Sequence, residues 1–180
     1  MRYKEPSIAS TITSTVIQKH HRMEKQKVCD ARPSTISELP RILELNKDAV
    51  PAVNLLNTQQ VRNLFLQAEY FRSLFLDQDV IGFLIALAPG ATYESPNYRW
   101  FELHYDRFLY VDRIVIDPSH QGNGFGRMFY DELKEFAGQK FPRIACEVNL
   151  RPKNESSLRF HQRYGFRQVG VQETEGGGKQ

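Results

Sequence analysis

The sequence predicts a single α/β or α+β domain built around a mixed sheet. Strand-like and helix-like patterns alternate through its second half, which is typical of such folds. A chain of 180 residues is long enough for one hydrophobic core and too short for two. Its content of 41% hydrophobic and 25% charged residues is that of a globular protein. The longest apolar run, 80–88, is too short to cross a bilayer, so we do not expect this chain to span a membrane.

The positive charge is concentrated in residues 1–27, which carry six basic and two acidic side chains. We expect this segment to be a disordered or non-native extension that precedes the domain of residues 28–180. In the non-native case, Met23 would be the true start; a transit peptide is the alternative. The remaining chain has a net charge of −1, which disfavours binding to nucleic acid. Cys29 and Cys146 form neither a disulfide framework nor a metal cluster, so we expect reduced thiols, no metal and a cytoplasmic location.

The first half of the domain predicts a strand over 28–32 and then two helices. Ser34 or Ser37 is expected to cap the first helix and Thr58 the second. Residues 70–76 and 80–88 read as two strands separated by three polar residues, which is the spacing of an antiparallel hairpin. Residues 89–107 are aromatic-rich and are expected to be irregular.

The second half begins with a long apolar strand over 108–116, which Pro118 ends. A glycine-rich loop and an amphipathic helix follow, and residues 143–148 predict another strand. Asn154 is expected to cap a last helix that runs to Tyr164 and ends at Gly165, and 166–169 to return to strand.

The loop between strand and helix carries glycines at every second position, Gly122, Gly124 and Gly126. Glycine allows close approach of a ligand, and the unpaired N–H groups at a helix start attract anions. Arg127 adds a cation in the first turn. The spacing matches neither a P-loop nor a dinucleotide fingerprint, so we expect a pyrophosphate site of another kind, or a tight turn without a ligand.

The pattern Gln121-x-x-Gly124-x-Gly126 after a strand resembles the acetyl-CoA-binding motif of the GNAT N-acetyltransferase superfamily. Residues 154–166 resemble its later helix, which ends in Gly-Phe, and 95–100 and 146–149 resemble a bacterial group within it. The resemblance implies a GNAT-like fold with a mostly antiparallel central sheet and helices on both faces. We expect the final strand of that fold to be missing, because 172–180 are polar and glycine-rich.

The resemblance also implies that acetyl-CoA is the acetyl donor and that the sheet is splayed beside the strand before the loop. In this gap, the pantetheine arm would be held by the backbone groups of Ile114, Val115 and Ile116. Loop N–H groups would hold the pyrophosphate, those of Gln121, Gly122, Asn123, Gly124, Phe125, Gly126 and Arg127. Asn154 matches a position that commonly touches the cofactor, with a plain helix cap as the alternative.

Acetyl transfer to an amine requires a base for the amine and an acid for the leaving thiolate. Asp112 is the first candidate base, expected on the strand face of Ile114 and Ile116 with Arg113 on the opposite face, and Glu147 is the second. A salt-bridged structural acid is the alternative for Asp112. His161 stands where the family usually has its acid tyrosine, with a structural histidine as the alternative, and Tyr164 is the fallback acid.

The leading hypothesis is an acetyl-CoA-dependent N-acetyltransferase that acts on a primary amine by direct transfer in a ternary complex. The acceptor would be a small molecule or a peptide, with no nucleic acid or membrane partner and a possible homodimer. A catalytically silent acyl-CoA sensor is the alternative. Residues 96–101 and 104–107 are expected either to close over the acceptor, with arginine binding an anion, or to plug one end of the sheet.

Overall fold

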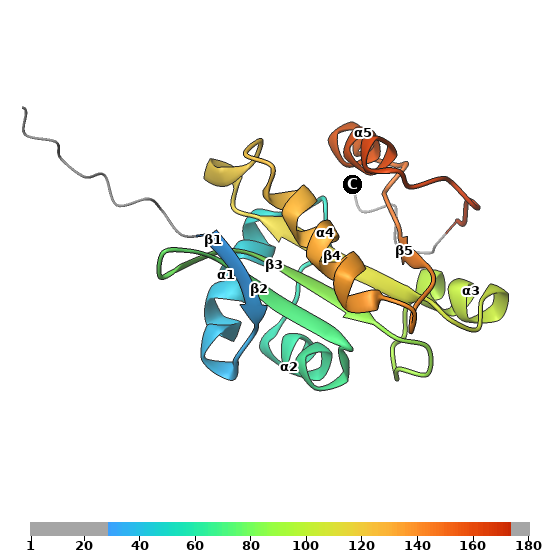
Figure 1. Ribbon diagram of the computed structural model, residues 1–180, viewed down its shortest axis with the longest axis horizontal. Helices are drawn as coiled ribbons and strands as arrows, with labels where there is room; N and C mark the ends of the chain where they lie inside the picture. Colours follow the sequence, from blue (N-terminus) through green and yellow to red (C-terminus); the bar gives the residue numbers. More distant parts are fainter. Residues whose placement is uncertain (1–28, 174–180) are drawn as a thin grey trace, which may run out of the picture.

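A five-stranded sheet runs through the protein in the order β1-β2-β3-β4-β5 (Figure 1). The structure is a computed structural model that describes residues 29–173. The strands are β1 (Cys29–Pro33), β2 (Tyr70–Leu76), β3 (Asp79–Leu87), β4 (Leu109–Ile116) and β5 (Ile144–Cys146). The first four strands pair antiparallel and β5 pairs parallel to β4, so the predicted mixed, mostly antiparallel sheet is confirmed.

Five α-helices and two short 3₁₀ turns connect these strands. The helices are α1 (Leu39–Asp48), α2 (Thr58–Gln67), α3 (Pro96–His104), α4 (Phe125–Ala137) and α5 (Glu155–Tyr164). The 3₁₀ turns are η1 (Ile36–Glu38) and η2 (Pro118–His120). No helix among residues 29–173 combines the length and apolarity needed to span a bilayer.

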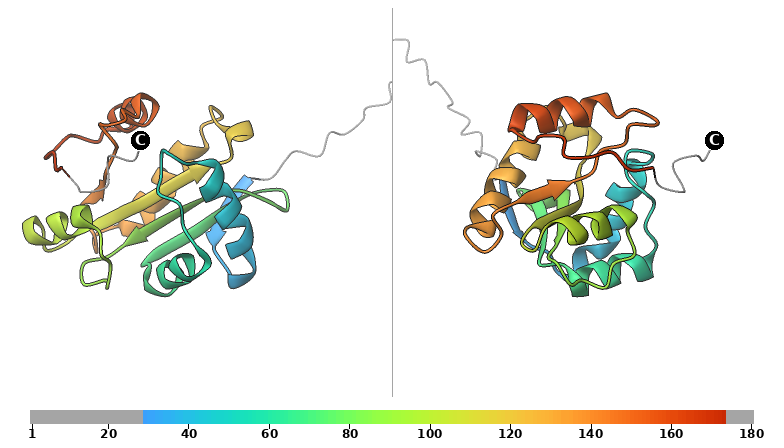
Figure 2. Two further views of the ribbon diagram at one scale, coloured as in Figure 1. Left: turned by 180° about the vertical axis from the view of Figure 1, so that it is seen from behind. Right: turned by 90° about the vertical axis from the view of Figure 1, so that its right-hand side faces the viewer.

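The helices cover both faces of the sheet, as expected (Figure 2). Side chains of α1, α2 and α3 pack with alternate residues of β3 and β4, such as Ile85 and Tyr110, in one cluster. Side chains of α4 pack on the other face with Leu84 and Val111, and α5 adds half-buried Phe160 to that second cluster. Alternation along β3 therefore divides the core into two layers.

Two of the predicted helix starts lie within two residues of the observed caps. Thr35, rather than Ser34 or Ser37, caps η1, which leads into α1. Asn57, rather than Thr58, caps α2. In both cases the third residue after the cap is an acid or amide that bonds back to the cap, Glu38 and Gln60, and this reciprocal pair fixes the boundary.

The predictions at the end of the domain are confirmed in part. Asn154 caps α5 by accepting a hydrogen bond from the Ser157 N–H, and Gly165 ends the helix at φ +114°. The strand expected over 166–169 is wrong, because residues 165–173 form neither helix nor strand. Phe166 packs against Tyr130 of α4 at a ring distance of 5.1 Å. Val28 and residues 1–27 and 174–180 lie outside the described residues.

The expectation of an irregular segment over 89–107 is also wrong, because α3 lies within it. Ser95 caps this helix and Pro96 occupies its first turn, a combination that favours a helix start. The helix buries Tyr98 and Phe101 against the sheet. It therefore covers part of this face of the sheet, and contact of the exposed residues of this segment with an acceptor stays a prediction.

Candidate active site

Strands β4 and β5 separate after a short parallel pairing. Their register runs from Leu109 opposite Ile144 to Val111 opposite Cys146. β5 ends at Cys146, whereas β4 continues to Ile116. Within the described chain, residues 113–116 of β4 therefore pair with β3 alone, which leaves their other edge open. The three strand residues expected to hold a pantetheine arm, Ile114, Val115 and Ile116, lie on this open edge.

Gly82 of β3 holds the opposite edge of β4 in place. A Cβ atom at Gly82 would lie 2.7 Å from the Val115 carbonyl oxygen and 2.8 Å from Ile116 Cδ1. Only glycine permits this approach of the two strands. The open segment of β4 is consequently supported by close backbone contact from behind.

The glycine loop after β4 leads to the start of α4 with the geometry of an anion site. Gly122 and Gly124 adopt φ of +82° and +84°, a region that side chains disfavour. Gly124 is the N-cap of α4 and supplies no side-chain acceptor to the first-turn N–H groups. The side-chain amides of Gln121 and Asn123 bond instead to carbonyls before and within the loop. The N–H groups of the first turn are therefore suited to a bound phosphate oxygen.

Gly126 has a different role from the other two glycines. A Cβ atom there would lie 3.1 Å from the ring of Phe160, so Gly126 permits α4 to pack closely on α5. Arg127 lies 3.6 Å from Asp131 and is 70% exposed, which leaves its guanidinium accessible beside the loop. The loop is anchored at its start, where the Arg41 guanidinium donates to Asp117 at 2.8 Å.

A β-bulge at Asp112 changes the expected arrangement of side chains. Ala86 of β3 pairs with Val111 and Ile85 pairs with Arg113, so Asp112 has no residue opposite it on β3. The bulge brings the Asp112 carboxylate to 2.6 Å from Arg113 Nε, and both side chains are 5% exposed. The predictions that Arg113 faces away from Asp112, and that Asp112 shares a face with Ile114, are therefore wrong. An inserted residue shifts the alternation along the strand.

Both carboxylate oxygens of Asp112 have partners. One accepts from Arg113, and the other accepts a hydrogen bond from the Tyr93 hydroxyl. Arg113 in turn donates to the Asn46 side chain of α1. Asp112 thus belongs to a buried polar network between β4, α1 and the segment before α3.

Glu147 is the second carboxylate of the site and lies just after the last residue of β5. Its carboxylate accepts a hydrogen bond of 2.7 Å from the Tyr110 hydroxyl of β4, and Asn97 of α3 is a second partner. Although much of the residue is exposed, the enclosure of its carboxyl group raises the pKa above the ordinary 4.5. The hydrogen bonds from Tyr110 and Asn97 oppose this shift.

The two candidate acids lie on the α4–α5 side of the sheet. His161 is buried, its Nδ1 lies 2.7 Å from the Ser157 carbonyl, and its Nε2 lies 2.8 Å from the Tyr130 hydroxyl. Because a carbonyl can only accept, Nδ1 carries the proton and Nε2 accepts from Tyr130. Burial lowers the pKa of His161. Tyr164 donates its hydroxyl proton to Asp131 on the surface of α4, and burial raises the pKa of Tyr164 to about 12.

The segment between β3 and β4 contributes side chains that the sequence did not single out as partners of the two carboxylates. Tyr93 and Asn97 come from this segment and contact the two carboxylates, as does Tyr110 of β4. Their signal in the sequence was only aromatic and polar composition. Arg107 was one of the arginines expected to bind an anion. It donates instead to the carbonyls of Gln139 and Lys140, just after α4.

The sequence that forms this fold matches a known family. The sequence model of the Acetyltransferase (GNAT) family matches residues 39–166, and the chain therefore belongs to that family. Among curated relatives, the Spermine/spermidine N(1)-acetyltransferase of Bacillus subtilis (strain 168) is 23% identical over 103 residues. The matched stretch covers 56% of this chain and 62% of that relative.

Solved structures confirm the GNAT-type fold. The aminoglycoside 6'-N-acetyltransferase AAC(6')-IG from Acinetobacter haemolyticus superimposes with a TM-score of 0.62 at 18% identity, over 81% of this chain and 96% of that one. An acetyltransferase of Trypanosoma brucei gives 0.59 at 18% identity, over 82% and 99%. The enzyme AAC(6')-Iy, solved with the bisubstrate analogue CoA-S-monomethyl-acetylneamine, gives 0.62 at 16% identity, over 82% and 97%.

Proposed function

We propose that this protein is an acetyl-CoA-dependent N-acetyltransferase that transfers an acetyl group to a primary amine by direct transfer in a ternary complex. The observation that carries the proposal is the open edge of β4, followed by a glycine loop and the start of α4, where the N-cap Gly124 offers no side-chain acceptor. Family membership and relatives that act on amines support the same reaction. The acceptor is a small molecule or a peptide with a free amine.

The donor site is assigned to the open edge and the loop. The backbone of residues 114–116 would hold the pantetheine arm, and the N–H groups of residues 121–127 would hold the pyrophosphate. Asn154 already caps α5 through the Ser157 N–H, and its second role at the donor is a proposal. Acetyl-CoA supplies the activated acetyl group as a thioester.

Glu147 is the better candidate for the proton acceptor. An alkylamine arrives mostly protonated, because its pKa is about 10.4 in water. Both oxygens of Asp112 are engaged by Tyr93 and Arg113, so its charge is largely compensated. The hydrogen-bond partners of Glu147, Tyr110 and Asn97, are both neutral, and its raised pKa makes it a stronger base than an ordinary carboxylate. In this scheme the role of Asp112 is to position the side chains of Tyr93 and Arg113 through its two hydrogen bonds.

The environment of His161 favours the sensor as a second candidate function. In the tautomer that the contacts require, its Nε2 has no proton to donate to a thiolate, and Nδ1 donates to Ser157. Tyr164 bonds to Asp131 on the helix surface. A protein that binds acyl-CoA without turnover would need no acid at either position.

Calorimetric titration of the full chain with acetyl-CoA, CoA and NADH tests the proposal first. Binding of both CoA forms without NADH is expected, followed by release of free thiol in the presence of an amine panel. Absence of CoA binding by a folded sample would overturn the donor site. Binding without turnover would favour the sensor. A cytoplasmic location and a homodimer remain predictions.

A further inference from the structure

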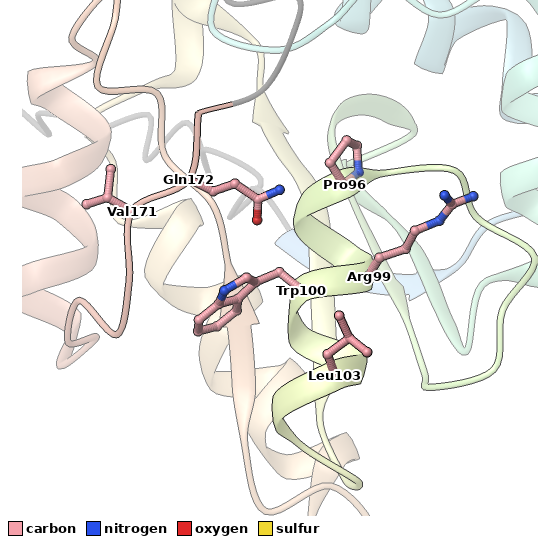
Figure 3. A pocket seen from close by; sticks show the side chains of 6 residues that line it. All are labelled: Pro96, Arg99, Trp100, Leu103, Val171 and Gln172. Atoms are coloured by element: carbon pink, nitrogen blue, oxygen red, sulfur yellow. The ribbon is translucent and has the colours of Figure 1, made fainter.

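A shallow hollow of about 380 Å³ lies between α3 and the segment after α5 (Figure 3). Its lining residues are Pro96, Arg99, Trp100, Leu103, Val171 and Gln172. None of these six carries a carboxylate, and the Arg99 side chain points away from Trp100 in Figure 3. The hollow is therefore an apolar surface with a cation at its rim.

Trp100 gives the hollow a flat aromatic wall. Its indole ring is half-buried and stacks on His104, with ring centroids 4.0 Å apart. A Cβ atom at Gly170 would lie 3.1 Å from the indole, so glycine allows the chain after α5 to lie against the ring edge. The rim is unusually apolar, because Leu103 is 83% exposed and Val171 is 66% exposed. Exposed apolar surface beside a functional site is typical of ligand binding.

The hollow begins at the turn of α3 that also contacts Glu147. Pro96 lines the hollow, and the next residue, Asn97, bonds to the Glu147 carboxylate. Asn97 and Trp100 are three residues apart on the helix, a spacing that places their Cβ atoms about 5–6 Å apart. A molecule with a ring beside Trp100 and a short aliphatic arm would thus present its terminal group near Glu147.

We propose that the hollow binds the ring of an aromatic primary amine, whose ammonium group reaches Glu147. The inference rests on the proposed function and specifies its acceptor class. The indole, leucine and valine match an apolar ring, whereas a polycation would gain no carboxylate in the hollow and would meet Arg99 at its rim. Glu147 supplies the one negative charge needed by the amine.

Fluorescence tests this proposal without any turnover, because Trp100 is the only tryptophan of the chain. The full chain is titrated with phenethylamine, cyclohexylamine and spermine. Phenethylamine is expected to change the emission saturably, and more tightly than cyclohexylamine, while spermine leaves the emission unchanged. Unchanged emission with phenethylamine, or an equal response to spermine, would overturn the proposal.

A matched pair of variants locates the binding. Leu103→Lys replaces an apolar side chain of the rim with a charged one and is expected to weaken phenethylamine binding by about tenfold, because it removes apolar contact with the ring. Leu66→Lys changes an equally exposed leucine on α2, 80% exposed, and should have no effect. Equal affinity in the two variants would contradict the proposed hollow.

Calorimetry with CoA on the same samples separates the two proposals. CoA binding with no phenethylamine binding would refute the acceptor class and leave the acetyltransferase proposal in place. Loss of CoA binding in the unmodified protein would refute the acetyltransferase proposal itself, whatever phenethylamine does.

Discussion

Arg113 Nη1 donates a hydrogen bond of 2.6 Å to Asn46 Oδ1, and this contact joins the bulge of β4 to helix α1. The same nitrogen lies 3.0 Å from the carbonyl of Asn54 in the connection between α1 and α2. With Asp112 bonded to both Tyr93 and Arg113, one network links the segments on two sides of the site.

We expect Arg113→Met to lower the free energy of unfolding by about 3–5 kcal/mol, because it leaves the Asp112 carboxylate buried without its cation. The double variant Asp112→Asn with Arg113→Met should lose less, since the unpaired charge is then absent. Urea denaturation measures both. A loss in the single variant no larger than in the double variant would contradict the pairing.

Glu147→Gln should lower kcat/KM by about 10²–10⁴-fold, because it removes the proposed proton acceptor. In the unmodified enzyme, activity should fall as the pH drops through the raised pKa of Glu147, a limb that lies above pH 4.5. The variant should lack that limb. Its control is Glu94→Gln, an exposed residue before α3. A wild-type pH limb in Glu147→Gln would transfer the role to another group.

Gly126→Ala should destabilise the protein by about 1 kcal/mol, because the new methyl group meets the ring of Phe160. Phe160 packs on Tyr130 at 5.8 Å, which restricts its retreat. In the Phe160→Leu background, Gly126→Ala should no longer incur the cost of this steric contact. Thermal unfolding of the wild type, the two single variants and the double variant measures the difference. Gly124→Ala, strained by its φ of +84°, should cost about 1–2 kcal/mol and show no rescue by Phe160→Leu.

Asp117 should stabilise the fold only above acid pH. The Ser119 hydrogen bonds, and secondarily Arg41, hold the pKa of Asp117 below its ordinary 3.8. A lowered folded-state pKa gives stability that is fully present above the unfolded value and is lost as the pH falls through the folded value. The difference in stability between the wild type and Asp117→Asn should therefore be constant above about pH 5 and close in stronger acid. A constant difference down to pH 2 would contradict this assignment.

Local patterns in the sequence predicted the β2–β3 hairpin and the glycine loop, because the apolar alternation and the glycine spacing act over a few residues. The bulge at Asp112 left no such signal, since it depends on how β3 and β4 pair across the sheet. It therefore reversed the expected orientation of Asp112. Helix α3 was missed although Ser95 and Pro96 mark its start, because the aromatic residues of this segment masked its 3.6-residue pattern.

The site itself was predicted in outline only. The sequence nominated the loop and Glu147 as candidates, but it did not reveal that Tyr110 and Asn97 bond to that carboxylate. Such contacts join three elements that are distant in the chain. They follow from packing and cannot be deduced from spacing.

Where β4 and β5 separate, the side-chain layers on the two faces of the sheet both border the gap between the strands. Ile114 packs in the α4–α5 layer, whereas Tyr93 and Asn97 meet the carboxylates from the side of α3. Under the proposed function, the two substrates then arrive by opposite routes, and neither has to leave for the other to enter. Initial-rate plots against both substrates should intersect, and no acetylated enzyme should accumulate when the acetyl donor is supplied alone.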